Sequence, residues 1–340
     1  MSIDRSEPGL TSSVARQLLK LSLATIAATV MALSAGHGQD LKQVRFAWNP
    51  NPQTPQVDVA IKNGLFKDAG LDVKVIAFPT GREALEALIG GQVDFAYMAE
   101  FPIATAALRK QNLKVIADLS RYQGQRVIAS AKTMKLESEK DLVGKKVGTT
   151  LGTNVEYFTY KLLNRAGGKA HIVNAGPADL VPALVRGDID AAVMFPTFFP
   201  AARKTLGNDY RELISTDYVL HMIISASAAA LEKDPEMATK FASALVKADE
   251  AMKKDPAAAQ QAVLANMKGV MPQAALQDMW KDFDFKVQLQ QDLLDLLADE
   301  AAWIVDRGMV KTDKPSAASL RPYLDGEPLK KVSAGLVQLP

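Results

Sequence analysis

A twelve-residue pattern occurs twice in this sequence, and the duplication restricts the fold more than any other feature. Residues 87–98 read ALIGGQVDFAYM and residues 183–194 read ALVRGDIDAAVM, so similar residues recur at a constant offset of 96 positions. In each copy a helical pattern ends at a glycine, Gly91 or Gly187, which adopts a left-handed backbone at little cost, and an apolar strand follows directly. The chain therefore contains the same helix-to-strand unit twice.

The duplication extends upstream of these twelve residues. Residues 74–88 and residues 170–184 each read as a strand, a turn and a helix with an acidic residue, Glu83 or Asp179, near its start, where a carboxylate complements the helix dipole. Strand, helix and strand at this spacing predict parallel pairing through a right-handed crossover. We expect an α/β protein with two lobes, each a mainly parallel sheet flanked by helices.

The order of the remaining segments predicts how the chain is divided between the lobes. We expect the first part of one lobe at 39–130, the second lobe at 131–222, and a return crossing with C-terminal helices that pack on the first lobe at 223–340. The apolar segments RVIASA and HMIISASAAAL are the expected crossing strands. The pattern after about Pro235 is helical and includes leucines at helical spacing.

Residues 1–38 resemble an export signal. Arg16 and Lys20 precede the apolar run LSLATIAATVMALSAG, which ends in small residues, as a signal peptidase site does. An uncleaved membrane anchor is the alternative, although the run is short for a span. The chain has no cysteine, so it has no disulfide and no thiol for a lipid. We expect a periplasmic protein that is not a lipoprotein.

Charge and composition argue against several classes of function. Lys and Arg number 40 and Asp and Glu number 38, which leaves no positive excess to hold nucleic acid. The three histidines, His37, His171 and His221, show neither a metal-ligand spacing nor a catalytic triad pattern. No glycine-rich phosphate motif is present. We expect no catalytic residue, no cofactor and no metal.

The loops that follow the predicted strands are the expected ligand site, because ligands of open parallel sheets bind beyond the carboxyl ends of the strands. These loops read WNPNPQTP, PTGRE, AEFP, TLGTN and FPTFFP. The expected contact residues are Trp48, Asn49, Gly81, Arg82, Glu100, Phe101, Thr150, Gly152, Thr153, Asn154, Phe195 and Thr197.

The residue types at these positions indicate a small polar organic ligand. Residues 150–154 offer hydroxyl and backbone N–H groups at a helix start, where an anionic group binds well. Trp48 and other aromatic side chains enclose an organic body, and Asn49 orients it. Glu100 indicates a donor at the other end of the ligand, as in a zwitterion or an amino-substituted ring.

Several of these residues also have structural interpretations. Thr153 and Glu156 have the spacing of a capping box, although a capped helix can still bind an anion. Arg82 also suits a solvated helix start, and Tyr97 also suits the core. The paired aspartates, Asp94 and Asp190, are expected to close the helix-to-strand turn rather than to contact ligand.

Longer segments of the chain resemble a known family. The segments GLFKDAGLDVKVIAF, GREALEALIGGQVDFAYM, LVGKKVGTTLGTNVEYF, LVPALVRGDIDAAVM and AAWIVDRGMV are similar to NMT1/THI5-like solute-binding proteins of ABC importers. The resemblance implies a two-lobed periplasmic binding fold of type II that closes over one ligand and docks on a permease. Many members have Trp, Glu and Pro where this chain has Phe195, Pro196 and Thr197. The enzymes of the family have a cysteine-rich motif that this chain lacks.

The function expected from the resemblance is capture of a small organic anion or zwitterion, such as a sulfonate or taurine-like compound, for an ABC permease and its ATPase. A thiamine-precursor pyrimidine or another heterocycle is the alternative ligand class. A pyrimidine-synthase-like enzyme is the less favoured alternative. A ligand sensor for a signalling receptor requires the same cleft, and the sequence does not separate it from a transporter component. We expect a monomer.

Overall fold

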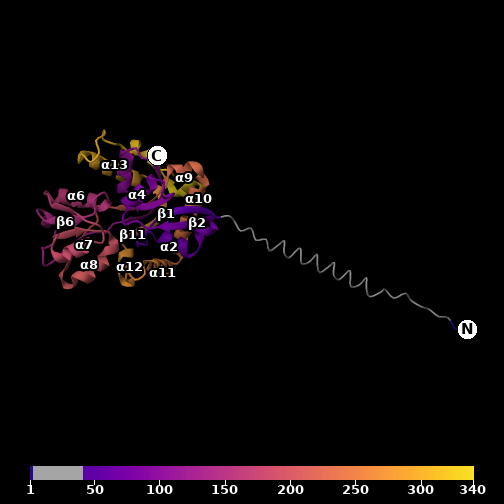
Figure 1. Ribbon diagram of the computed structural model, residues 1–340, viewed down its shortest axis with the longest axis horizontal. Helices are drawn as coiled ribbons and strands as arrows, with labels where there is room; N and C mark the ends of the chain where they lie inside the picture. The colour runs from indigo at the N-terminus through magenta and orange to yellow at the C-terminus, as the bar shows by residue number, and fades with distance from the viewer. Residues whose placement is uncertain (3–40) are drawn as a thin grey trace. The chain divides into compact units, whose positions relative to one another are not determined.

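Two β-sheets organise the chain, and each contains one copy of the duplicated unit (Figure 1). The computed structural model describes residues 1–2 and 41–340, so the export signal expected at 1–38 and His37 lie outside the described residues except for the first two. Residues 41–340 form one unit. No helix within the described residues is long and apolar enough to span a membrane.

The first sheet has seven strands and is built from both ends of the described chain. Its strands, in spatial order, are β12 (Val337–Gln338), β11 (Phe283–Gln290), β4 (Leu113–Tyr122), β10 (Leu220–Ser227), β3 (Phe95–Ala99), β1 (Lys42–Ala47) and β2 (Leu71–Ile76). β1 pairs in parallel with β2 and β3, whereas β10 pairs antiparallel with β3 and β4.

The second sheet has five strands, and their order repeats that of the first sheet from its edge strand β2 to β4. Its strands, in spatial order, are β7 (His171–Asn174), β6 (Lys146–Thr149), β8 (Ala191–Val193), β5 (Gln125–Ser130) and β9 (Tyr210–Ser215). β6 pairs in parallel with β7 and β8, just as β1 does with β2 and β3. The predicted α/β fold with two lobes is therefore confirmed. Both sheets are mixed rather than mainly parallel, because β10 in the first sheet and β5 in the second each pair antiparallel with both of their neighbours.

Two short segments connect the sheets, at residues 123–124 and 216–219. We call residues 41–122 and 220–340 lobe I and residues 125–215 lobe II. β5 and β10, which contain the two apolar segments expected to cross, each belong to one sheet, and the chain crosses just before each of them. The exact ends of the lobes remain a prediction.

Helices cover both sheets (Figure 1). Before residue 220 they are α2 (Pro55–Lys62), α3 (Leu65–Asp68), α4 (Gly81–Ile89), α5 (Phe101–Leu108), α6 (Asn154–Ala166), α7 (Leu180–Arg186), α8 (Phe199–Leu206) and the 3-10 turns η1 (Glu139–Leu142), η2 (Pro196–Phe198) and η3 (Gly207–Asp209). After it they are α9 (Ala228–Lys233), α10 (Pro235–Lys254), α11 (Pro256–Met267), α12 (Gln273–Trp280), α13 (Gln291–Asp306), α14 (Ala317–Leu320), α15 (Glu327–Val332), η4 (Arg321–Tyr323) and η5 (Ala334–Leu336).

The C-terminal part of the chain packs on lobe I through an aromatic cluster. Phe241 of α10 stacks on Phe95 of β3 with ring centroids 4.4 Å apart and contacts Phe46 and Phe66. Phe46, Phe95 and Phe241 are fully buried, and burying a side chain of this size stabilises the fold by about 1.5–3 kcal/mol.

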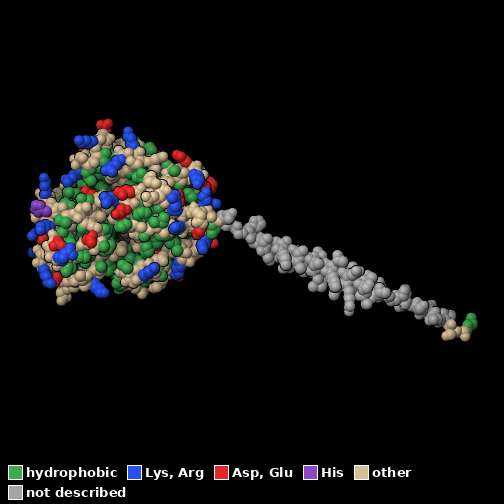
Figure 2. All heavy atoms as spheres, viewed as in Figure 1, with side chains coloured by type: hydrophobic (Ala, Val, Ile, Leu, Met, Phe, Trp, Pro, Cys, Tyr) green, Lys and Arg blue, Asp and Glu red, His purple; other side chains and the backbone are tan. Residues whose placement is uncertain are grey.

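On the surface, basic and acidic side chains are interspersed over the face drawn in Figure 2.

The expectation that the chain after Pro235 is entirely helical is wrong. β11 extends the first sheet by pairing with β4, and β12 pairs with β11. The sequence of β11, FDFKVQLQ, alternates apolar and polar residues, which is the pattern of a strand with one buried face. The leucine-rich helix that follows it, α13, begins only at Gln291.

Candidate functional site

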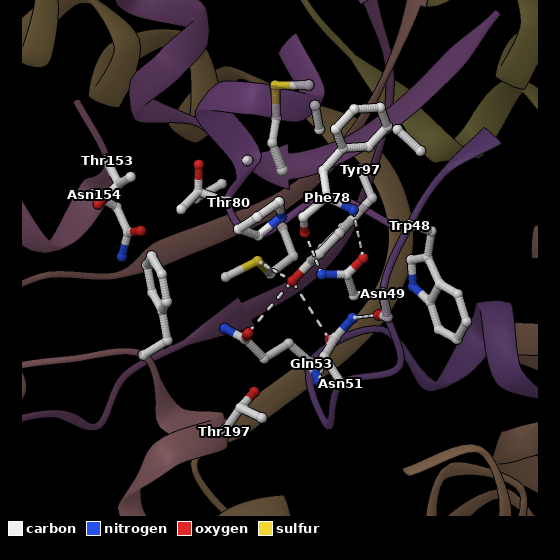
Figure 3. A pocket seen from close by; sticks show the side chains of 18 of the residues that line it. Trp48, Asn49, Asn51, Gln53, Phe78, Thr80, Tyr97, Thr153, Asn154 and Thr197 are labelled. Carbon is white, nitrogen blue, oxygen red and sulfur yellow. Dashed lines mark hydrogen bonds between the residues drawn. The ribbon is translucent and has the colours of Figure 1, made fainter. Parts of the chain in front are cut away.

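A cavity of about 180 Å³ lies between the lobes at the carboxyl ends of β1 and β3 (Figure 3). Of the residues expected from the sequence, those that line it are Trp48, Asn49 and Gly81 from lobe I and Thr153, Asn154, Phe195 and Thr197 from lobe II. The other lining residues are Ala47, Pro50, Asn51, Gln53, Phe78, Pro79, Thr80, Ala84, Tyr97, Met98, Ala99, Pro102, Phe198 and Met222.

The loop after β1 is held in place by its own side chains. Trp48 donates from Nε1 to Oγ1 of Thr54 at 2.9 Å, and Asn51 accepts from the backbone N–H of Gln53 at 2.8 Å, which is an Asx turn. Asn49 accepts from the backbone N–H of Phe78 at 2.9 Å and donates back to its carbonyl. Asn49 therefore ties the loop to the segment after β2, and its amide is already engaged.

Tyr97 connects the floor of the cavity to this loop. Its hydroxyl lies 3.3 Å from Oε1 of Gln53 and 3.4 Å from Oδ1 of Asn51 (Figure 3). Burial raises the pKa of Tyr97 far above its usual value, so the hydroxyl stays neutral and acts as a donor. Tyr97 also lines the cavity, so it is not only a core residue.

Two buried amide groups in the cavity lining have no hydrogen-bond partner. Nε2 of Gln53 and Nδ2 of Asn154 are both unpaired, and the two residues are only 5% and 2% exposed. Leaving such a donor unsatisfied costs about 1–3 kcal/mol. One donor comes from lobe I and the other from lobe II, so a ligand with two acceptor groups satisfies both only when it contacts both lobes.

The lining carries no side chain that is charged at neutral pH. Its aromatic members are Trp48, Phe78, Tyr97, Phe195 and Phe198, and its polar members are amides and hydroxyls. An apolar wall with a few placed polar groups is typical of a site for a small organic ligand. Within the described residues, no group of three or more histidine or acidic side chains is placed to hold a metal.

Five of the expected contact residues do not line the cavity, and Glu100 is the most consequential. Its side chain is fully buried behind the cavity wall, where it accepts hydrogen bonds from the hydroxyl of Tyr218 and from the backbone N–H of His221 at 2.9 Å. The backbone of Glu100 is already helical (φ −67°, ψ −35°) as it enters α5. The carboxylate therefore is sealed off from a ligand in the cavity, and no acid in the lining can pair with a ligand amine.

The other four expected contacts also lie outside the cavity lining. Phe101 is fully buried and stacks on Tyr157 at 5.9 Å. Thr150 donates to the carbonyl of Ala175 at 2.9 Å. Gly152 and Arg82 lie just outside the cavity, next to the lining residues Thr153 and Gly81.

The capping box expected at Thr153 and Glu156 does not form. Thr153 donates to the carbonyl of Thr150 at 2.7 Å, and Glu156 accepts from the backbone N–H of Gly152 at 2.6 Å. A full capping box forms instead at α4, between Thr80 and Glu83. Both helices therefore begin at the cavity, each with a carboxylate bound at its N-terminal turn.

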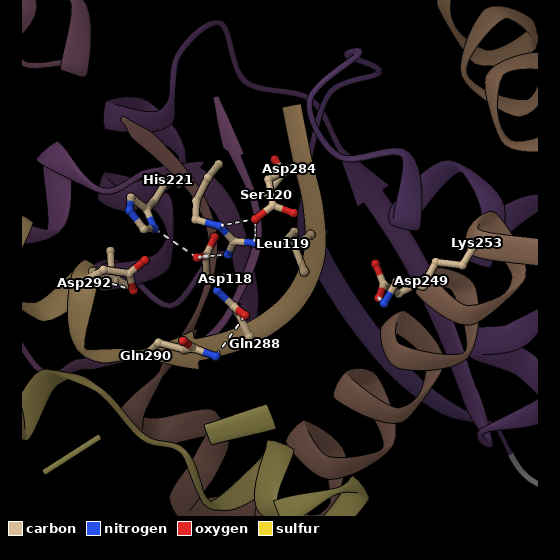
Figure 4. A network of polar contacts seen from close by, with 12 residues as sticks. Asp118, Leu119, Ser120, His221, Asp249, Lys253, Asp284, Gln288, Gln290 and Asp292 are labelled. Carbon is tan, nitrogen blue, oxygen red and sulfur yellow. Dashed lines mark hydrogen bonds and ion pairs between the residues drawn. The ribbon is translucent and has the colours of Figure 1, made fainter. Parts of the chain in front are cut away.

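Behind the cavity wall lies a buried ionisable cluster of Glu100, Tyr218, His221, Asp118 and Glu300. Nδ1 of His221 is 2.9 Å from Oδ2 of Asp118, which also pairs with Arg121 at 3.0 Å (Figure 4). Burial raises the pKa of Glu100 and raises that of Glu300 well above the usual value. Burial lowers the pKa of His221, but the charge of Asp118 outweighs it and the net shift is upward.

Sequence reasoning missed Asn51, Gln53, Thr80 and Met222. The loop WNPNPQTP was correctly placed at the site, and its amide residues were the available signal for Asn51 and Gln53. Met222 lies on β10, which reaches the cavity only because the chain returns to lobe I. No local pattern identifies such a residue.

Comparisons with known proteins identify the family of this chain and agree with its fold. The sequence profile described as NMT1/THI5 like matches residues 51–259, and the chain belongs to this family. The predicted family is therefore confirmed, and the relatives described below are periplasmic or solute-binding proteins.

Three related proteins illustrate what this chain is similar to. The taurine-binding periplasmic protein of Escherichia coli is 27% identical over 145 residues, which are 42% of this chain and 45% of that protein, so the match spans less than half of the relative. The formylaminopyrimidine-binding protein of Halalkalibacterium halodurans is 26% identical over 233 residues, which are 66% of this chain and 70% of the relative. The structure of the alkanesulfonate-binding protein SsuA from Xanthomonas axonopodis pv. citri, bound to MOPS, has a TM-score of 0.71 at 16% identity and covers 84% of this chain and 99% of its own.

Proposed function

We propose that this protein is the substrate-binding component of an ABC importer, which captures a small organic solute between its lobes in the periplasm and delivers it to a membrane permease. Membership of the NMT1/THI5-like family and the periplasmic binding relatives support this role. The observation that carries the proposal is the pair of unsatisfied donors, Gln53 Nε2 and Asn154 Nδ2, one in each lobe of the same cavity. A non-enzymatic role agrees with the lining, which contains no acid, base or nucleophile of the usual catalytic types apart from hydroxyl groups.

The lining favours an uncharged heterocycle with acceptor atoms at two positions, such as a substituted pyrimidine. Aromatic side chains supply flat apolar surface, and the two amides supply donors for a carbonyl oxygen or a ring nitrogen. A free ammonium group on the ligand has no carboxylate to pair with in this lining, because Glu100 is sealed away. Burying an unpaired charge is costly, so a taurine-like zwitterion is disfavoured.

A sulfonate without an amine is the second candidate. α4 and α6 both begin at the cavity, and helix N-termini stabilise anions. The similarity to the taurine-binding and alkanesulfonate-binding proteins also supports this ligand class. The carboxylates of Glu83 and Glu156 already occupy N–H groups at these two helix starts, which makes the sites weaker for a second anion.

A thermal-shift screen of the mature protein against pyrimidines, other small heterocycles, alkanesulfonates and taurine tests the proposal. A ligand at 100 times its dissociation constant stabilises the protein by about 2.7 kcal/mol. For the best compound, Asn154→Ala removes one donor and weakens binding about 3- to 10-fold, since a neutral hydrogen bond is worth about 0.5–1.5 kcal/mol.

Asn164→Ala is the matched control, because Asn164 is exposed on the same helix. Its affinity by titration calorimetry should equal that of the unmodified protein. No stabilisation by any compound of these classes, or equal affinities of the Asn154→Ala and Asn164→Ala variants, would contradict the proposed site.

A further inference from the structure

Arg82 of lobe I and Gly152 of lobe II meet beside the cavity. Arg82 is the second residue of α4 in lobe I, directly after the lining residue Gly81, and Gly152 directly precedes the lining residue Thr153 in lobe II. A Cβ atom on Gly152 would lie 2.6 Å from Cδ and 3.4 Å from Nε of Arg82. The stem of the arginine therefore rests on the backbone of the facing lobe, at a place where a side chain at position 152 would displace it.

The rest of this contact lies on one face of α6. Tyr157 packs against Phe101 at 5.9 Å and against Trp303 at 5.4 Å, and both of these partners belong to lobe I. Tyr160, one turn from Glu156, lies under the guanidinium of Arg307 with 4.2 Å from its carbon to the ring centroid. Positions spaced three or four apart share a helix face, so α6 presents one continuous surface to lobe I.

Glu156 lies on the same face of α6 as Tyr160, within electrostatic range of Arg82 and Arg307 of lobe I. Burial raises the pKa of Glu156, whereas the hydrogen bond from the Gly152 N–H and the charges of Arg307 and Arg82 lower it. The carboxylate also fixes the Gly152 turn through this 2.6 Å hydrogen bond. The same acid thus holds the backbone on which Arg82 rests and attracts the two arginines.

We propose that Arg82 is a latch that seats on Gly152 and holds the lobes closed over the cavity, so that it sets how fast a bound ligand escapes without contacting the ligand. This inference rests on the proposed binding function. Contacts made only in the closed state increase the fraction of molecules that are closed. If the ligand site is complete only in the closed state, the apparent affinity for ligand is proportional to that fraction.

The glycine at position 152 allows a sharp test. Gly152 has φ +77°, and so does Gly187 in the same lobe, where a Cβ would meet only the methyl group of Thr133 at 4.0 Å. Gly152→Ala and Gly187→Ala therefore impose similar backbone strain, but only the first inserts a methyl group against Arg82. The difference between the two variants isolates the contact across the cleft.

The chain has no cysteine, so spin labels can be attached specifically at introduced cysteines. The distance between two such labels reports closure of the lobes and requires no ligand. Spin labels at Glu86→Cys on α4 and Asn164→Cys on α6, both exposed positions, report the distance between the lobes by pulsed electron resonance. We expect a minor open population in the otherwise unmodified protein, and at least a fivefold larger open-to-closed ratio with Gly152→Ala or Arg82→Ala. The ratio should stay unchanged with Gly187→Ala or with Arg109→Ala, which removes an exposed arginine beyond the far end of α5.

The double variant Arg82→Ala/Gly152→Ala completes the cycle. Once the arginine stem is removed, the methyl group at position 152 has nothing to displace, so adding Gly152→Ala to Arg82→Ala should change the ratio by less than about twofold. For a ligand found in the screen, Arg82→Ala should raise the dissociation rate about 3- to 10-fold, with a smaller change in the association rate.

Equal distance distributions for Gly152→Ala and Gly187→Ala, or additive effects of Arg82→Ala and Gly152→Ala, would overturn the latch. These distance measurements need no ligand. Failure of the ligand screen therefore contradicts the proposed function, whereas failure of the double-variant cycle contradicts the latch alone.

Discussion

The two copies of the duplicated unit share their backbone and differ in what they deliver to the cleft. In lobe I, Asp94 accepts from the backbone N–H of Arg45 at 2.8 Å, and in lobe II Asp190 accepts from that of Lys146 at 2.8 Å. Gly91 and Gly187 both have positive φ, at +68° and +77°. The expectation that these aspartates close the helix-to-strand turn needs correction, because each carboxylate instead bonds the neighbouring parallel strand, at Arg45 or at Lys146.

The copies diverge directly after the strand. In lobe I the chain continues into Glu100 and Phe101, both fully buried, whereas at the matching positions in lobe II Pro196 is buried and Thr197 lines the cavity. Lobe I uses its strand end to anchor the hinge region through Tyr218 and His221. Lobe II uses its strand end to line the site. Duplication therefore predicts the scaffold, and each copy specialises at the strand end.

The largest expected effect comes from truncating the matched pair Phe101 and Thr197. Phe101→Ala should lower the free energy of unfolding by about 3–5 kcal/mol, because it leaves a cavity in a fully buried aromatic contact. Thr197→Ala should change it by less than about 0.5 kcal/mol and act on ligand affinity instead. Urea unfolding of both variants measures the difference, and similar losses of stability would remove the distinction between the two strand ends.

A second prediction concerns pH, since only the lobe I copy carries an acid at its strand end. The pKa values of Glu100, Glu300 and His221 are all raised in the folded protein. Groups with a raised pKa contribute stability that is complete below the unfolded pKa and is lost as pH rises through the folded pKa. The free energy of unfolding should therefore fall on going from about pH 5 to about pH 8, by up to about 1.4 kcal/mol per pH unit for each group that must ionise.

Glu300→Gln makes this pH dependence specific to the cluster. Removing one of the two buried acids should flatten the curve of unfolding free energy against pH, whereas Glu250→Gln, at an exposed position of α10, should leave it unchanged. Guanidinium melts at four pH values supply the curves. Stability that increases toward pH 8, or equal slopes in the two variants, would show that the cluster does not behave as described.

The smallest expected effect lies where the two copies agree. Asp94→Asn and Asp190→Asn each keep an acceptor oxygen for the backbone N–H, at 2.8 Å in both copies, and lose its charge. Each should cost about 0.5–1.5 kcal/mol. Asp94 also forms an ion pair with Arg45, whose side chain is 46% exposed. An exposed ion pair contributes little to stability, so the costs of Asp94→Asn and Asp190→Asn should be similar. Costs that differ by more than about 2 kcal/mol would show that the two turns are not equivalent.

Much of the scaffold follows from the sequence because it depends on local patterns. The turns are predicted by the spacing of a glycine and an aspartate in each copy, Gly91 with Asp94 and Gly187 with Asp190. The parallel strands are predicted by the order strand, helix, strand. The sequence of β11, FDFKVQLQ, also has the two-residue period of a strand. The prediction is wrong there because it applies the helical period of the flanking segments to the strand as well.

The cavity was predictable as a location but less so in its chemistry. Trp48 and Asn154 follow from the rule about strand ends, whereas Glu100 faces away because the chain is already helical there and the side chain meets Tyr218 from a crossing segment about 120 residues later. The sequence pattern places a residue at the carboxyl edge of a sheet but does not determine which way its side chain points. Long-range partners decide that direction, and the sequence does not display them.

The most direct test of the account is a crystal structure of the protein with the compound that stabilises it best in the screen. The account predicts one ligand molecule between the lobes, with acceptor atoms within hydrogen-bond distance of Gln53 Nε2 and Asn154 Nδ2 and with Glu100 still bonded to Tyr218. A ligand bound elsewhere, or one that leaves both amides unpaired, would contradict the account.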